Sequence, residues 1–295
     1  MTGMLTGPLS RREFVAAAAA SLTAARPGAA QTLTAGALIE RIRANIGAPW
    51  NDKSADGLKA GDPTTLVTGV AVTVMATLDV LRRASAAKQN FVVTQEPTYY
   101  AANDNPGTRE IDPVYLAKRA FIEKERLVIC RLVDHWHQTH PQSAPRALAN
   151  ALGWGQERWT ADEDIYSVPA TTLSTLAAEV RKRLNTRGGV RIVGRPDLPI
   201  RTVYVAPGTT SMPGVLEHIA RADVVIAGEP REWEAVPYIA DAVTAGQAKG
   251  MISLGRLVSE EPCAVAQSVW IKSLVGALPV DSIRLSDPYW SASAS

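Results

Sequence analysis

Two stretches with one shared pattern, FVVTQEP at residues 91–97 and VVIAGEP at residues 224–230, decide the fold of this chain. Each is an apolar run that ends in Glu-Pro, and each follows a helix-like stretch with a Val-Leu pair, at 80–81 and at 215–216. An apolar run that ends at a proline is typical of a buried strand that stops there. The repeat therefore predicts two halves, each of which runs a strand, helix and strand unit into a Glu-Pro corner.

The two corner glutamates, Glu96 and Glu229, are candidate site residues because of where they stand. Open α/β sheets bind ligands just beyond the carboxyl ends of their strands. The alternative is that Glu-Pro only begins a turn with a solvated carboxylate, since loop carboxylates usually face water. The spacing alone leaves both interpretations open.

Strand-like and helix-like segments alternate along the rest of the chain, which predicts an α/β fold of two similar lobes with mixed sheets flanked by helices. We expect the first lobe at 31–155 and a linker with the second lobe at 156–295, because 154–169 resembles a surface loop. The expected strands lie near 68–75, 90–94, 127–132, 189–194, 201–206, 223–227, 250–254 and 280–284. The expected helices lie near 34–45, 78–88, 114–125, 145–151, 171–185, 213–221, 233–246 and 262–274.

Residues 1–30 have the pattern of a twin-arginine export signal. The pair Arg11-Arg12 precedes a short run of small apolar residues, and PGAAQ follows at 27–31 as a cleavage region. The run is too short to span a bilayer as a stable helix. We therefore expect cleavage near Ala30 and a periplasmic or secreted protein without a membrane anchor.

The composition excludes some classes of protein. The formal net charge of the 295 residues is +2, which argues against a dedicated nucleic-acid surface. The two cysteines, Cys130 and Cys263, could pair in an oxidising compartment, but Cys130 lies in the apolar run LVIC at 127–130 and is typical of a buried small side chain.

The densest group of reactive side chains is DHWH at residues 134–137, directly after the predicted strand at 127–132. Imidazole and carboxylate groups are common ligands of divalent metals. In an extended loop, the i, i+2 spacing of His135 and His137 turns both rings to one side. His140-Pro141 instead fits the turn into the next helix. The alternative for the cluster is a surface loop of hydrogen-bonded imidazoles.

A second candidate is GRLVSEEP at 255–262, where a predicted strand ends and a helix begins. A carboxylate at such a place lies in the favourable field of a helix N-terminus. Arg256 and Glu260 are spaced i, i+4 there and face each other on one side of a helix.

Together, TQEP at 94–97, DHWH at 134–137, GEPREWE at 228–234 and LGRLVSE at 254–260 resemble the Nif-three-like dinuclear metal-centre family, also labelled GTP cyclohydrolase 1 type 2-like. The resemblance covers about 35–290. It implies two similar α/β lobes, a pair of divalent metals in the cleft between them and a ring-shaped hexamer. Fold transfers better than function in such a family.

The chain departs from the family at its metal ligands. The family has histidine where this chain has Gln95, Val133 and Arg256, and neither an isopropyl group nor a guanidinium is an ordinary metal ligand. The resemblance leaves Glu96, Asp134, His135 or His137, and Glu260 as candidate ligands of zinc, iron or manganese, at most one ion per chain. The alternative is that no metal binds.

Two functions follow from this resemblance. In the first, a metal-dependent hydrolase acts on a small anionic substrate, with Glu96 or Glu260 as general base and Arg256 neutralising developing charge. The small-residue loop at 206–211 is a weak candidate for binding its phosphate. In the second, the protein is an inactive metal- or anion-binding protein in which Arg256 replaces a metal cation. The aromatic candidates for ligand contact are Tyr99, Tyr100 and Trp136. The alternative, which we favour for Tyr99 and Trp136, is that they are core or interface residues.

Overall fold

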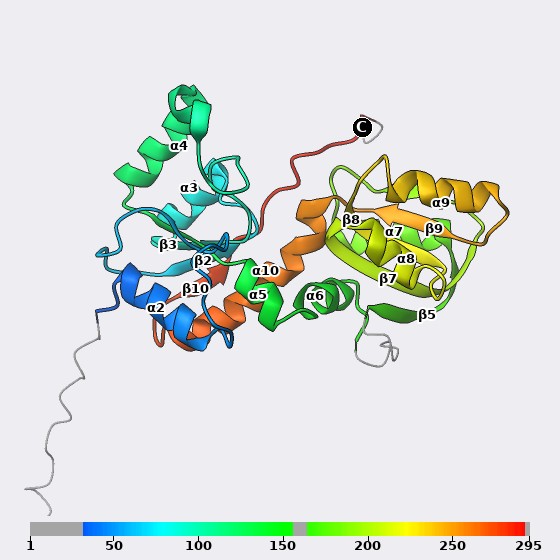
Figure 1. Ribbon diagram of the computed structural model, residues 1–295, viewed down its shortest axis with the longest axis horizontal. Coiled ribbons are helices and arrows are strands. Elements are labelled where there is room, and N and C mark those ends of the chain that lie inside the picture. The colour runs from blue at the N-terminus through cyan, green and yellow to red at the C-terminus, as the bar shows by residue number, and fades with distance from the viewer. Residues whose placement is uncertain (1–31, 156–163, 293–295) are drawn as a thin grey trace, which may run out of the picture. The chain divides into compact units, whose positions relative to one another are not determined.

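Two five-stranded mixed sheets form the framework of the protein (Figure 1). A computed structural model describes residues 32–155 and 164–292. In the first sheet the strand order is β1-β4-β3-β2-β10, and every neighbour pair is parallel except the antiparallel edge pair of β1 and β4. Its strands are β1 (Gly57–Ala60), β2 (Val70–Thr73), β3 (Phe91–Thr94), β4 (Val128–Arg131) and β10 (Val280–Ser282).

The second sheet has the order β5-β7-β8-β9-β6. The central strands β7, β8 and β9 are parallel, and the edge strands β5 and β6 are antiparallel to their neighbours. Its strands are β5 (Ile165–Thr172), β6 (Arg191–Val193), β7 (Pro199–Thr210), β8 (Val224–Pro230) and β9 (Gly250–Ser253).

The two sheets repeat one parallel core. Strands β2, β3 and β4 correspond in order and direction to β7, β8 and β9, and an antiparallel edge strand pairs with the last strand of each set. The corner at Glu96-Pro97 follows β3, and Glu229-Pro230 ends β8, the corresponding strand. This topology confirms the predicted α/β fold of two similar lobes with mixed sheets.

Helices cover both faces of each sheet, as Figure 1 shows within each lobe. In the first lobe α2 and α10 pack on one face, and α3 and α4 pack on the other. In the second lobe α6 and α7 pack on one face, and α8 and α9 on the other. The helices are α2 (Ala35–Asn45), α3 (Leu78–Ala86), the 3-10 helix η1 (Gly107–Ile111), α4 (Pro113–Lys124), α5 (Asp134–Thr139), α6 (Ser143–Ala151), α7 (Leu173–Leu184), α8 (Met212–His218), α9 (Ala235–Thr244) and α10 (Arg256–Leu274).

The helices on both faces of each sheet explain why the central strands are uninterrupted apolar runs in the sequence. In β2, Val70 and Val72 pack toward α2 and α10, while Ala71 between them packs toward α3 and α4. A strand with helices on both faces has no solvent-facing side, so all its positions are apolar. Burial of these side chains is the main favourable contribution to the folding free energy.

The chain returns to the first sheet at its end. Residues Leu33–Ser295 cluster as one compact unit. Helix α10 packs against strands of both sheets, and the strand after it, β10, pairs in parallel with β2. Strand β10 at 280–282 is thus part of the first sheet, although it lies within 156–295, the range expected for the linker and second lobe.

Two further expectations need correction. Strand β5 falls in the segment expected to be a loop at 154–169, and β1 was not expected. Both are antiparallel edge strands, where half-exposed positions weaken the apolar signal. In contrast, α7 matches the helix expected at 171–185, because the Thr172 side chain accepts a hydrogen bond from Thr175 N at its start and Asn185 ends it with φ of 51°.

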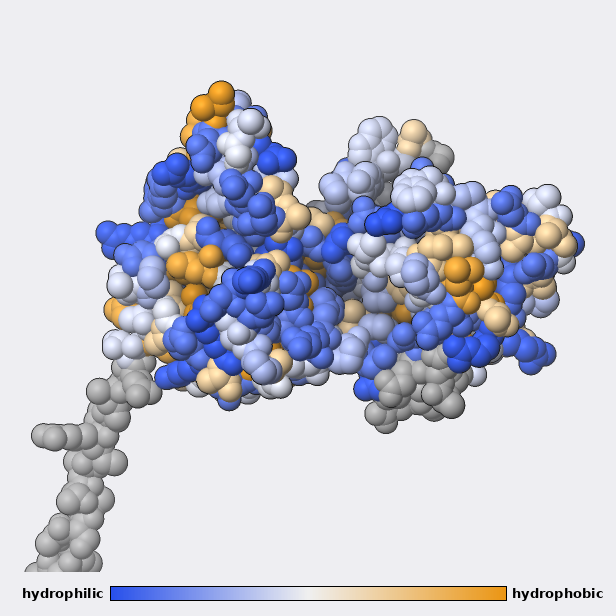
Figure 2. Space-filling model, in the orientation of Figure 1, coloured by the Kyte–Doolittle hydropathy of each residue, from blue (hydrophilic) through white to orange (hydrophobic). Residues whose placement is uncertain are grey.

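The remaining expectations concern the export signal, the membrane and the cysteines. The expected export signal at 1–30 and its cleavage region lie outside the described residues. Among the described residues, none of the helices is both long and apolar enough to cross a membrane. Cys130 is buried in β4 as expected, and both cysteines are free thiols. Ile111 in η1 and Val114 at the start of α4 are exposed apolar residues, and Figure 2 shows apolar side chains at the tip of the first lobe.

Candidate functional site

Arg256, the first residue of α10, is the centre of the candidate site. Its Nε donates to Glu96 Oε1 at 2.8 Å, and its Nη2 lies 2.6 Å from the same oxygen. Its Nη1 donates to Thr209 Oγ1 at 2.8 Å and lies 3.5 Å from Glu229 Oε2, and its Nε lies 3.4 Å from Glu260 Oε2. We call these five residues, Arg256, Glu96, Thr209, Glu229 and Glu260, the Arg256 cluster.

The Glu96 corner is held in place by Arg131, the last residue of β4. Arg131 Nε donates to Gln95 O at 2.9 Å, and its Nη1 donates to Ala102 O at 2.7 Å and lies 3.3 Å from Asp104 Oδ2. These contacts tie both ends of the loop after β3 to the neighbouring strand. The buried ion pair therefore fixes the backbone that carries Glu96 toward Arg256.

The second lobe contributes Thr209 from β7 and Glu229 from β8, which are paired in the sheet register. The segment expected to be a loop at 206–211 is instead the end of β7, with an irregular register between Ala206 and Thr209. It lies close to α10, because Gly208 N donates to Ser259 Oγ at 3.0 Å. A Cβ on Gly228 would lie 2.3 Å from Gly208 O, and one on Gly208 would lie 2.4 Å from Glu260 Oε1. Glycine at 228 permits the close approach of the two strands, and Gly208 lies against the Glu260 carboxylate.

Glu260 is the buried carboxylate of the cluster, with a side chain 9% exposed. Burial raises the pKa of Glu260 to about 7, although the Arg256 charge opposes this rise and the charges of Glu96 and Glu229 add to it. Its Oε2 has no hydrogen-bond partner among the described residues, so the contact with Arg256 is an ion pair only. A carboxyl group with a pKa near neutrality is able to give and take a proton at physiological pH.

The charge of Arg256 is unusual at its position. A helix N-terminus favours an anion, yet Arg256 is the first residue of the 19-residue α10. Burial lowers the pKa of Arg256, but Glu260 and Glu96 outweigh this effect and hold the guanidinium pKa above its ordinary value. The cluster thus contains one permanent positive charge among three glutamates, and its formal charge is negative.

The histidine-rich segment forms helix α5 and not the extended loop expected from the sequence. Successive helical side chains are about 100° apart, so residues at i and i+2 point in different directions. Burial lowers the pKa of His137, although the charges of Asp134 and Asp56 oppose this effect. Asp134 Oδ2 accepts a hydrogen bond from Ala55 N at 2.8 Å.

The His135 ring makes contacts that stabilise the fold. Its Nδ1 lies 2.7 Å from Asp56 Oδ2, and its Nε2 accepts a hydrogen bond from Asn51 N at 2.9 Å. Asp56 also accepts hydrogen bonds from three backbone N–H groups at the start of α5, those of residues 133, 134 and 135. Both ring nitrogens are therefore engaged within the protein, and Asp56 caps the helix from outside it.

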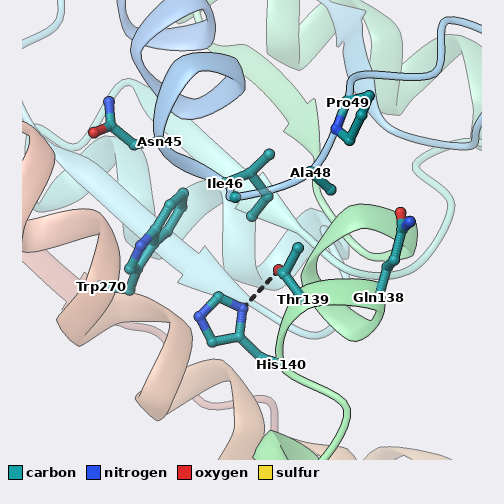
Figure 3. Close-up of a pocket in the computed structure, with 9 residues that line it drawn as sticks. Asn45, Ile46, Ala48, Pro49, Gln138, Thr139, His140 and Trp270 are labelled. Atoms are coloured by element: carbon teal, nitrogen blue, oxygen red, sulfur yellow. Dashed lines mark hydrogen bonds between the residues drawn. The ribbon is translucent and has the colours of Figure 1, made fainter.

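His140 lies beside a different pocket, of about 560 Å³ (Figure 3). Its Nδ1 is 2.8 Å from Thr139 Oγ1, and its ring centroid lies 6.4 Å from that of Trp270 on α10. None of the Arg256 cluster residues lines this pocket. As expected from the sequence, His140 follows α5 and belongs to the turn that leads into α6.

The metal centre implied by the resemblance does not fit these residues. Within 32–155 and 164–292, no group of three or more His, Cys, Asp or Glu side chains is placed to hold a metal ion. The Arg256 guanidinium contacts the carboxylates that a metal would need, and the buried Gln95 has no hydrogen-bond partner for either amide atom in the part of the chain that the structure describes. An isolated amide oxygen is a weak ligand for such an ion.

The fold and the cluster define a two-lobed α/β protein whose candidate site lies at strand ends of both sheets. Residues 43–249 match the Duf34/NIF3 (NGG1p interacting factor 3) family, and the chain belongs to this family. This confirms the resemblance found in the sequence. A search of curated proteins finds no match to the chain.

Solved structures share the fold at low sequence identity. The Staphylococcus aureus protein SA1388 is 15% identical with a TM-score of 0.67, and the match covers 88% of this chain and 99% of that protein. A Bacillus cereus protein related to NIF3 is 13% identical with a TM-score of 0.63, over 89% and 100% of the chains. Reduced HcgD from Methanocaldococcus jannaschii is 13% identical with a TM-score of 0.56, over 85% and 98%. At these identities the similarity establishes the fold alone.

Two contacts of the site were not predicted from the sequence. Thr209 lies in the segment 206–211 that was a weak candidate for binding phosphate, but its contact with Arg256 was not predicted because the two residues are remote in sequence. Asp56 lies before β1, and only the structure reveals that it caps α5. Glu229 was found through the repeated Glu-Pro corner. Tyr99 is buried and packs edge-on against Tyr115, and Trp136 is buried against His140, so both belong to the core.

Proposed function

We propose that this protein is a ligand-binding member of the NIF3 family in which the guanidinium of Arg256 replaces a divalent metal cation. One observation supports this most strongly: Arg256 is within ion-pair distance of Glu96, Glu229 and Glu260, which come from three separate parts of the chain. Clustered carboxylates repel one another without a cation, and a guanidinium remains charged at ordinary pH.

The charge of the cluster changes the class of ligand that we propose. The sequence led us to expect a small anion, but one guanidinium among three glutamates leaves a negative formal charge. Glu229 is 60% exposed and Arg256 is 33% exposed, so a ligand has access to both. A small molecule with a positively charged or hydrogen-bond-donating group is therefore the better complement.

The test is to restore the missing imidazoles. In the double variant Gln95→His and Arg256→His, removal of the guanidinium and addition of two ligands should allow Zn²⁺ or Mn²⁺ to bind the folded protein. The melting temperature should then rise with added metal, because a ligand that binds only the folded state stabilises it. The unmodified protein and Arg231→His, a control in which Arg231 pairs with Glu234 outside the cluster, should respond weakly or not at all.

A second function, acid–base catalysis without a metal, is favoured by the pKa of Glu260 near 7. The carboxyl group would transfer the proton and Arg256 would stabilise charge on the reacting group. The check is hydrolysis of p-nitrophenyl esters and phosphates in the presence of chelator. A rate that persists in chelator and is lost in Glu260→Gln supports catalysis, whereas the absence of such a rate rejects it for these substrates.

A further inference from the structure

Two adjoining cavities lie beside the first turns of α10, on the side of this helix opposite the residues of the Arg256 cluster. The larger has a volume of about 650 Å³ and the smaller about 390 Å³. Four residues line both cavities: Leu184, Val258, Glu261 and Arg284. None of the residues of the Arg256 cluster lines either cavity, so the proposal below is independent of the function proposed above.

The larger cavity is mainly apolar. Its walls include Ala147 and Ala151 from α6 and Pro262, Val265 and Ala266 from α10. Val265 is 53% exposed, so the apolar wall continues to the protein surface. Small side chains on two facing helices leave space that larger ones would fill, and the volume lies in the range of about 300–1,000 Å³ that is typical of small-molecule sites.

The smaller cavity is cationic. Arg83, Arg187 and Arg284 line it, against the two carboxylates of Glu261 and Asp287. Arg146 and Arg183 add two further guanidinium groups to the lining of the larger cavity. Two of these arginines also pair with carboxylates that do not line the space, Arg83 with Asp79 and Arg183 with Glu179. The arginines still exceed the lining and paired carboxylates in number, so the joined space carries a positive formal charge.

Arg284 stands where the two cavities meet. Its Nη2 donates to Leu184 O at 2.7 Å, and its Nε lies 3.7 Å from Glu261 Oε2. Glu261 Oε1 accepts a hydrogen bond from Leu285 N at 3.0 Å. The Glu261 carboxylate thus holds Arg284 at the junction, and an anion that binds there would lie beside both groups. Burial raises the pKa of Glu261, while the Leu285 N–H and the Arg284 charge oppose this effect.

We propose that the joined cavities bind one amphiphilic small molecule with an anionic head group. Its apolar part lies between α6 and α10, and its carboxylate or phosphate lies at Arg284 with Arg187 and Arg83 nearby. Apolar burial supplies most of the affinity, and the guanidinium groups select a planar or tetrahedral anion through charge-assisted hydrogen bonds.

Isothermal titration of the full chain tests this with four probes below their micelle concentrations. Dodecanoate and dodecyl phosphate should bind, and their relative affinities identify the preferred head group. Dodecanol should bind at least about tenfold more weakly because it lacks the charge. Dodecyltrimethylammonium, which has the same chain and the opposite charge, should not compete. The proposal is overturned if neither anion binds, or if the cationic probe binds as tightly as the anions.

Two variants locate the binding. Arg284→Gln removes the charge at the junction and should weaken dodecanoate binding by about tenfold or more. Ala147→Phe fills the apolar cavity and should abolish binding of all the probes that bind the unmodified protein. Arg195→Gln is the matched control, because Arg195 is exposed, pairs with Asp197 and lines neither cavity. Circular dichroism checks the fold, and if Arg284→Gln does not fold then Ala147→Phe decides. Unchanged binding in a folded Ala147→Phe protein would contradict the proposed location.

Discussion

Arg256 Nε donates to Glu96 Oε1 at 2.8 Å and so joins the first turn of α10 to the corner that follows β3. The two residues are 160 positions apart in the chain. Glu96 follows a strand of the first sheet, whereas Arg256 follows β9 of the second sheet. This ion pair is therefore a direct link between the strand ends of the two sheets.

Replacement of Arg256 should destabilise the protein. In Arg256→Gln, the mostly buried Glu96 loses a hydrogen bond to a charged group, which contributes about 1.5–3 kcal/mol, and the buried Glu260 loses its ion pair. We expect the free energy of unfolding, measured by urea denaturation at pH 8, to fall by about 2 kcal/mol.

The matched control for this variant is Arg231→Gln. Arg231 is 57% exposed and pairs with Glu234 on the surface, so its loss should change the free energy of unfolding by less than about 1 kcal/mol. Equal effects of the two substitutions would mean that Arg256 does not compensate the clustered carboxylates.

The titration of Glu260 should make stability depend on pH. Because burial raises its folded-state pKa from 4.5 to about 7, the folded protein binds a proton more tightly than the unfolded chain does. The contribution of Glu260 to stability is then fully present below about pH 4.5 and is lost as pH rises to about 7. Glu260→Gln should lose this dependence, so the variant should gain stability relative to the unmodified protein over this pH range.

Urea denaturation at pH 5, 6, 7 and 8 measures this difference. Glu217→Gln, which replaces an exposed glutamate of α8, should show no comparable gain between pH 5 and pH 7. If the stabilities of Glu260→Gln and the unmodified protein differ by a constant amount at all four values, Glu260 does not titrate in this range.

Replacement of Asp56 should destabilise the protein, although this residue lies just before an edge strand. Asp56→Ala removes the acceptor for three backbone N–H groups and for His135, all at the start of α5. Unpaired buried donors cost about 1–3 kcal/mol each, so we expect a loss of at least about 2 kcal/mol in thermal or urea denaturation. Asp62→Ala, which removes an exposed carboxylate that accepts from Thr64, should change stability clearly less than Asp56→Ala does.

Gly228 should not tolerate a side chain. In Gly228→Ala the new Cβ would meet Gly208 O at 2.3 Å and Ser259 Oγ at 2.5 Å, so the end of β7 beside Glu260 must shift. We expect a loss of about 1–3 kcal/mol in the free energy of unfolding. In Gly246→Ala the new Cβ meets nothing within 4 Å and only the φ of 82° is strained, so this control should lose less. A smaller loss of stability in Gly228→Ala than in Gly246→Ala would contradict the close packing of Gly228 against Gly208 and Ser259.

The fold was largely predictable because buried strands and amphipathic helices leave local signals. The apolar runs at 91–94 and 224–227 predicted β3 and β8, and their shared Glu-Pro ends predicted the duplication that the two sheets confirm. The edge strands β1 and β5 could not be predicted in this way, since each has exposed positions and little alternation. The return of β10 to the first sheet depends on how α10 packs, which no local pattern records.

The candidate site was predictable only in part. The strand-end rule and the family resemblance pointed to Glu96, Arg256 and Glu260, and these three residues do meet. The directions of His135 and His137 depended on whether residues 134–139 are helical, and that six-residue stretch is too short for a periodic signal. The contact of Thr209 with Arg256 and the cap by Asp56 are tertiary contacts, so the sequence gives no sign of either.

The most direct test of the central claim, that the Arg256 guanidinium replaces the metal, is the metal content of the unmodified protein. The protein should be incubated with excess Zn²⁺ or Mn²⁺, dialysed exhaustively and examined by elemental analysis against the Gln95→His and Arg256→His double variant. The account predicts that the unmodified protein retains well below one ion per chain and that the double variant retains more. Retention of one or two ions per chain by the unmodified protein would contradict it.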